Sequence, residues 1–197
     1  MAADLEYVRN VSLSSGTSTY ITLDLSGMSA YKDAVIFFQG FLSGNDNDGS
    51  SVRLQAYTAS GWQQSYNSSS YIFNNHNATS TTYHNNNNPG MQLNGKWTTH
   101  QTLYGWAQTG GMGCMMIEIM NFSASGSRAP IVQFQTGTPS SRNDSNQAHQ
   151  YETTLGMCSL GHSSGSYNGA WSYARLYTDG HSWRSPSIAH IYGRKFD

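Results

Sequence analysis

The chain has 197 residues, only 11% of them charged, and its formal net charge at pH 7 is −1. A typical soluble domain has roughly 25% charged residues, so this surface must owe its polarity mainly to Ser, Thr, Asn, Gln and Gly. The ten Lys and Arg side chains are scattered from Arg9 to Lys195, whereas a protein that neutralises phosphates clusters them. We therefore expect no nucleic-acid partner.

The sequence also argues against a membrane location. No stretch approaches the about 18 consecutive apolar residues of a membrane-spanning helix. Residues 1–6 lack the basic and apolar regions of a signal peptide, so we expect synthesis in the cytoplasm. The length suits one sandwich domain over residues 1–197.

Short runs rich in Val, Ile, Tyr and Phe recur between Gly, Asn and Ser clusters, and helical periodicity is nearly absent. This pattern predicts strands. The predicted strands lie near residues 5–13, 19–25, 34–41, 51–58, 70–74, 99–105, 113–121, 130–136, 151–160, 170–178 and 188–193. The predicted fold class is all-β, an antiparallel β-sandwich of the jelly-roll type with an elaborated loop region over 60–111.

Two of these strands are apolar almost throughout, namely residues 34–38 and residues 114–120. Continuous apolar strands are typical of a sheet covered on both faces. A second sheet would cover one face, and an insertion loop or a neighbouring subunit could cover the other. We interpret the methionines of this region mainly as core filling; they are Met112, Met115, Met116 and Met120.

Neither the cysteines nor the acidic loop predicts a metal site. Cys114 and Cys158 are the only cysteines, and each lies in an apolar run, which favours buried free thiols. The Asn/Asp-rich segment 45–49 resembles a calcium loop, but Gly44 and Gln55 stand where that loop needs oxygen ligands. We interpret it as a hairpin turn and expect no metal and no cofactor.

The end of the chain alternates with a period of two. Trp171, Tyr173, Arg175 and Tyr177 alternate with small or apolar residues, which is the pattern of a half-buried strand. A second strand-like run follows at 188–195 after a polar connection. The two runs together predict a closing β-hairpin.

Several segments carry a family resemblance. They are the opening strands at 19–27 and 31–38, the Gly/Asp/Asn loop at 44–49, the Leu- and Arg-containing strand at 52–57, and the terminal strand at 188–195. In these elements the chain resembles a family of small β-sandwich virion proteins of tailed bacteriophages. The resemblance implies a non-enzymatic structural protein of the virion surface that forms homotrimers and contacts other virion proteins.

Residues 60–111 are rich in Asn, Ser, Tyr, Trp and His, the composition of recognition loops. Flat aromatic rings stack on the apolar faces of sugars, and amides pair with sugar hydroxyls. The predicted ligand is therefore a host-surface glycan, although the same aromatics also suit a small core or a subunit interface. The candidate ligand-binding residues are Trp62, Tyr66, Tyr71, Tyr83, His84 and Trp97.

These observations leave three hypotheses for function. The first is a tail-fibre or tail-tip adhesin that contacts host glycan, and the second is a capsid decoration protein that clamps shell subunits. The weaker third is a glycan-cleaving depolymerase. Glu118 and Glu152 are candidate acids with no sign of juxtaposition, and the Gly-His-Ser-Ser-Gly run at 161–165 is interpreted as a turn. We therefore expect no enzyme activity.

Overall fold

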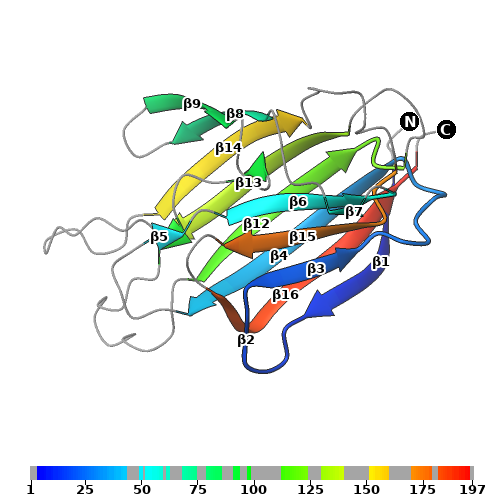
Figure 1. Cartoon of the computed structure of the whole chain (residues 1–197), viewed down its shortest axis with the longest axis horizontal. Coiled ribbons are helices and arrows are strands. Elements are labelled where there is room, and N and C mark those ends of the chain that lie inside the picture. Colours follow the sequence, from blue (N-terminus) through cyan, green and yellow to red (C-terminus); the bar gives the residue numbers. More distant parts are fainter. Residues whose placement is uncertain are drawn as a thin grey trace, which may run out of the picture.

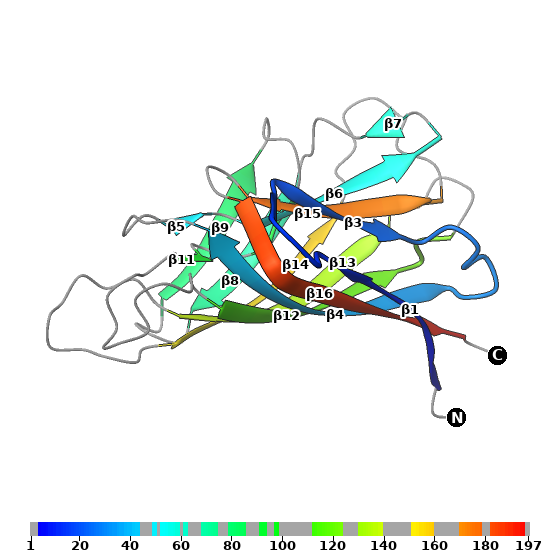
Figure 2. The ribbon, with the colours of Figure 1, turned by 90° about the horizontal axis from the view of Figure 1, so that it is seen from below.

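The computed structural model describes residues 4–43, 49–50, 52–59, 61–62, 68–74, 79–85, 91–93, 97–98, 112–123, 130–139, 151–159, 170–178 and 182–195. All regular elements in these ranges are strands. Apart from one separate two-stranded pair, they form two antiparallel sheets packed face to face (Figures 1 and 2). The predicted all-β sandwich is confirmed at this level. None of these residues belongs to a helix long and apolar enough to cross a membrane.

The larger sheet contains nine described strands. At one edge of this sheet, Leu5 lies opposite Arg194. Eight of the nine strands form one continuous series, and the ninth, β2 (Thr17–Ser18), pairs with the second strand of that series. The eight are β1 (Leu5–Ser12), β16 (Ser182–Arg194), β4 (Asp33–Ser43), β12 (Met112–Met120), β13 (Ile131–Pro139), β14 (Tyr151–Ser159), β8 (Ser68–Asn74) and β9 (Thr79–Asn85).

The smaller sheet lies over the middle of the larger one. Figure 2 shows its strands β3 (Tyr20–Asp24), β6 (Val52–Thr58) and β15 (Tyr173–Thr178) above β4, β12 and β16. Its described strands, in spatial order, are β10 (Met91–Gln92), β6 (Val52–Thr58), β15 (Tyr173–Thr178) and β3 (Tyr20–Asp24), with β7 (Gly61–Trp62) beside β6. A separate pair joins β5 (Gly49–Ser50) to β11 (Trp97–Thr98).

The core lies between the sheets and is built by period-two alternation. Alternate residues of the central strands point inward and are almost completely buried, because successive side chains of a strand face opposite sides. The central strands of the two sheets supply most of these residues. They include Ile21, Leu23, Leu54, Ala56, Ala174 and Leu176 from the small sheet, and Ile36, Phe38, Ile117, Ile119, Val132, Phe134, Ala189 and Ile191 from the large sheet.

The predicted closing hairpin is wrong, because its two strands lie in different sheets. β15 pairs with β3 and β6, whereas β16 pairs with β1 and β4. The chain crosses between the sheets after Thr178, and Trp183 near the start of β16 is fully buried between them. Its indole N–H donates a hydrogen bond of 3.1 Å to the Leu176 carbonyl of β15. Burial of this ring therefore directs the crossover.

The second sheet covers one face of β4 and β12, as expected, whereas the other face is only partly covered within the described part of this chain; its cover by a neighbouring subunit stays a prediction. Ile36 and Met115 are buried, but Phe37 is 41% exposed and Met116 is 37% exposed. Cys114 is an exposed free thiol, so its predicted burial is wrong. In both strands the second sheet covers the inward residues and leaves apolar side chains on the outer face.

Not every strand was predicted. The composition of Thr79–Asn85, mostly Thr, Ser, His and Asn, predicts a loop. The structure shows that this segment is a strand, β9, which pairs with β8 over seven residues. The predicted strand at 99–105, the loop at 44–48 and the turn at 161–165 lie outside the described residues, as does the side chain of Cys158.

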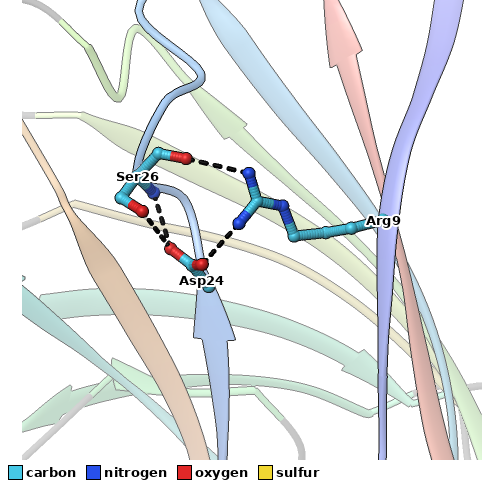
Figure 3. A network of polar contacts seen from close by, with 3 residues as sticks. All are labelled: Arg9, Asp24 and Ser26. Carbon is cyan, nitrogen blue, oxygen red and sulfur yellow. Dashed lines mark hydrogen bonds and ion pairs between the residues drawn. The ribbon is translucent and has the colours of Figure 1, made fainter.

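An ion pair joins the two sheets at one open edge (Figure 3). Arg9 of β1 reaches the carboxylate of Asp24 at the end of β3, and it also donates to the Ser26 carbonyl at 3.0 Å. The Ser26 amide and hydroxyl donate to the other Asp24 oxygen at 2.9 and 2.6 Å. Gly27 follows at φ 74°, a backbone conformation that favours glycine. This network fixes the turn that leaves β3.

The network lowers the pKa of Asp24. Partial burial by itself would raise this pKa, but the hydrogen bonds from Ser26 and the charge of Arg9 outweigh it. A carboxyl whose folded-state pKa is lowered stabilises the fold above its ordinary pKa, which is 3.8 here. That stabilisation is lost as the pH falls through the folded-state value.

We expect Asp24→Asn to be less stable than the wild type at pH 7, with the difference shrinking as the pH falls below about 4. Urea unfolding at a series of pH values measures this. Asp4→Asn is the control, because Asp4 is exposed and makes no hydrogen bond or ion pair within the described residues. A difference for Asp24→Asn that does not change with pH would contradict the assignment.

Gly40 makes room for the aromatic pair at the centre of the core. The Phe38 and Trp183 rings meet edge to face at 4.8 Å between centroids. A Cβ on Gly40 would lie 2.6 Å from the Trp183 ring and even closer to Phe38. Real Cβ atoms do not approach other atoms so closely, so any side chain here must displace a ring.

We therefore expect Gly40→Ala to reduce the free energy of unfolding by about 1–3 kcal/mol through overpacking. Urea denaturation at pH 7 measures the change. Gln133→Ala, at an exposed position of the same sheet, should stay within about 0.5 kcal/mol of the wild type. Equal stability of Gly40→Ala and the wild type would show that the rings yield without cost.

Candidate binding surfaces

Five of the six residues predicted to bind glycan are described, and they are distributed over three sheets. The five are Trp62 on β7, Tyr71 on β8, Tyr83 and His84 on β9, and Trp97 on β11, whereas Tyr66 lies outside the described residues. The β8–β9 hairpin brings three of them together at the edge of the large sheet. Among these six, the structure describes side-chain contacts for Trp62.

Trp62 belongs to an aromatic cluster on the outer face of the small sheet, the face turned away from the core. The register places Tyr173 opposite Tyr57, and Tyr57 opposite Trp62. The Tyr57 ring meets the Trp62 ring at 5.1 Å and the Tyr173 ring at 5.8 Å, both edge to face. Such arrangements are favourable for aromatic pairs, so three strands present one packed row of rings.

Arg175 completes this group, which we call the aromatic–arginine cluster: Tyr20, Tyr57, Trp62, Tyr173 and Arg175. The guanidinium carbon of Arg175 lies 4.3 Å from the Trp62 ring centroid and 5.2 Å from that of Tyr20, within cation–π range. Its Nε donates a hydrogen bond of 2.6 Å to the Gln55 side chain, which is 1% exposed. The guanidinium is therefore held at a fixed position.

The cluster offers two kinds of contact to a ligand. Tyr20 is 47% exposed, and the rings of Tyr57, Trp62 and Tyr173 are partly exposed, so apolar ring surface meets solvent. Arg175 adds hydrogen-bond donors and a positive charge beside these rings. Because all five residues sit on paired strands, their positions are set before a ligand arrives.

Sequence reasoning found one member of the cluster and missed the other four. The signal for Tyr173 and Arg175 was present, because their period-two alternation predicts one shared face. Tyr20 and Tyr57 carry the same alternation in β3 and β6. What the sequence lacked was the strand order that places β3, β15, β6 and β7 side by side.

The chain was also compared with known proteins. No family model, curated protein or solved structure matches it. The resemblance to phage virion proteins therefore stays a prediction, and the geometry of the described surfaces must carry the argument about function.

A second candidate surface covers the outer face of the large sheet. Phe37 of β4, Met116 of β12 and Leu155 of β14 lie in one row, with Gln135 of β13 between the last two. Leu155 is 46% exposed. Tyr192 meets both Phe37 and Tyr7 edge to face at 5.5 Å. The other exposed apolar side chains of this face, which we call the apolar face, are Ile131 and Met157.

The apolar face contains a shallow groove of about 410 Å³. It lies between the row of Phe37 and His190 and the neighbouring row of Gln39, Cys114 and Gly137. In the second row, Gly137 has no side chain and that of Cys114 is small, so space remains open beside them. The thiol of Cys114 lies in the lining, where a reagent can reach it.

The described residues do not form the acid pair of a glycoside hydrolase from Glu118 and Glu152. Glu118 is ion-paired with Arg194. Glu118 lies opposite Gln133 of β13, and Gln133 lies opposite Met157 of β14. Glu152 comes five positions before Met157 in that strand. Five positions span about 16 Å, well beyond the about 9.5 Å of a working pair. The described residues also contain no group of three potential metal ligands.

We expect Cys114 to react with a thiol reagent in the folded protein, because its side chain is exposed on the apolar face. Peptide mass spectrometry after treatment with iodoacetamide in the absence of denaturant locates the label. Cys114→Ser is the control and should lose the label at this position. Labelling of Cys114 only after denaturation would contradict its exposed position.

Proposed function

We propose that this chain is a non-enzymatic structural protein of a bacteriophage virion surface, a tail-fibre or tail-tip component that contacts host-surface glycan. The jelly-roll topology and the homotrimeric state belong to the same proposal. The single observation that supports glycan contact is the aromatic–arginine cluster, which places Trp62 on an outer sheet face with three tyrosines and an arginine.

The chemistry of the cluster suits a sugar. Aromatic rings accept the apolar face of a pyranose ring, and the guanidinium donates to hydroxyl or ring oxygens. Trp62 contacts the Arg175 guanidinium within cation–π range and the Tyr57 ring edge to face, and these contacts restrict all three side chains. Because little side-chain freedom remains to be lost, binding costs less ordering entropy than it would on a flexible loop.

We expect Trp62→Ala to weaken binding of the purified protein to host cells by about tenfold or more, since loss of this ring removes a stacking surface and a neighbour of Arg175. Flow cytometry with labelled protein measures the binding. Tyr7→Ala is the matched control, an exposed aromatic on the opposite face of the sandwich. Circular dichroism confirms that both variants fold.

Two results would count against this proposal. Unchanged binding of a folded Trp62→Ala protein would remove the cluster from the contact. Equal loss for Trp62→Ala and Tyr7→Ala would point to an effect that is not specific to the small sheet.

The second candidate function is capsid decoration, and the apolar face favours it. Phe37, Met116, Leu155 and Met157 expose apolar side chains, interspersed with Gln133 and Gln135, that packing against another virion subunit would bury. Burial of apolar surface favours association, against the entropy that association costs. An adhesin can use the same face for self-association, so the two functions differ in where on the virion the protein sits.

A further inference from the structure

Arg175 has donor groups for which the described part of the chain supplies no acceptor. A guanidinium carries five N–H donors in a planar fork. Within the described residues, Arg175 spends Nε on Gln55 and contacts the Trp62 and Tyr20 rings through its face. Its two terminal nitrogens donate no hydrogen bond there, and no carboxylate pairs with it.

The nearest acidic side chain in the register does not neutralise this charge. Asp24 of β3 lies opposite Tyr173, two positions along β15 from Arg175. Its carboxylate is already held by Arg9 and Ser26 (Figure 3). Among the described residues, the outer face of the small sheet therefore presents a fixed cation, Arg175, without an acidic partner and beside the Trp62 and Tyr20 rings.

A planar fork with free terminal N–H groups matches a carboxylate, which can accept two parallel hydrogen bonds. The adjoining Trp62 and Tyr20 rings favour an anion that is attached to an apolar ring rather than a free ion. Arg175 supplies one charge, which suits a singly charged sugar acid better than a doubly charged phosphate.

We propose that Arg175, with Trp62 and Tyr20, forms a subsite for a carboxylate-bearing sugar of an acidic glycan. This inference rests on the proposed glycan-binding function and specifies its substrate class. In the subsite the Arg175 terminal nitrogens hold the carboxylate, and the two rings contact the sugar. Gln55, which is buried and lies opposite Arg175 on β6, accepts the Nε hydrogen bond and so sets the direction of the guanidinium.

The test compares two polysaccharides that differ only in this charge, polygalacturonate and its methyl ester. Calorimetric titration of the full chain should show tighter binding to polygalacturonate. Arg175→Gln should lower the affinity for polygalacturonate by about 10- to 100-fold, the effect of losing a charged hydrogen-bonded pair, with little change for the ester. Arg175→Lys, which keeps the charge but not the fork, should fall between Arg175→Gln and the wild type.

Failure of this inference is distinguishable from failure of the proposed function. Equal binding of the two polysaccharides, or an equal loss for both with Arg175→Gln, would overturn the acidic-sugar subsite. So would a wild-type chain that binds neither polysaccharide. If Trp62-dependent binding to host cells persists in any of these cases, the cluster still recognises glycan and only the ligand class is wrong. If it is absent too, the proposed function also fails.

Discussion

Trp183 is buried between the two sheets, and the arrangement of the other elements depends on how it is held there. Its indole N–H needs a partner once it leaves water, and the Leu176 carbonyl of the opposite sheet supplies it. Phe38 packs against the ring edge to face, and Gly40 gives the pair its space. This contact joins β16 to β15 across the core, so Leu176 points inward and Arg175, the next residue along β15, points outward.

The sandwich therefore has two outer faces of different chemistry. The small sheet carries aromatic rings and the Arg175 guanidinium, which Gln55 and Trp62 hold in place. The large sheet carries exposed apolar side chains such as Phe37 and Met116. The first face suits a polar ligand with an apolar ring, and the second suits a protein partner. A virion surface protein must do both, because it has to attach to the particle and meet its surroundings.

The sequence predicts local features well and long-range pairing poorly. Alternation in 170–178 correctly predicts a half-buried strand, because that pattern depends only on neighbouring residues, but it does not show that Trp171 is buried. The pairing of β15 with β6 instead of β16 depends on the burial of Trp183, which alternation does not encode. In 34–38 and 114–120, runs that are apolar except for Glu118 hide which side chains face out, so the exposure of Phe37 and Cys114 is missed. Of the cluster, Trp62 was found by composition, whereas Tyr20 and Arg175 meet only through the strand order.

We propose that this protein sits on the virion where it can contact host glycan. Immunogold electron microscopy of virions, with antibody raised against the purified chain, tests it most directly. We expect gold at the tail end, which would make the small-sheet face a host-contacting surface. Gold spread evenly over the head would contradict the account and favour a decoration protein, and absence of gold from the virion would remove the virion proposal altogether.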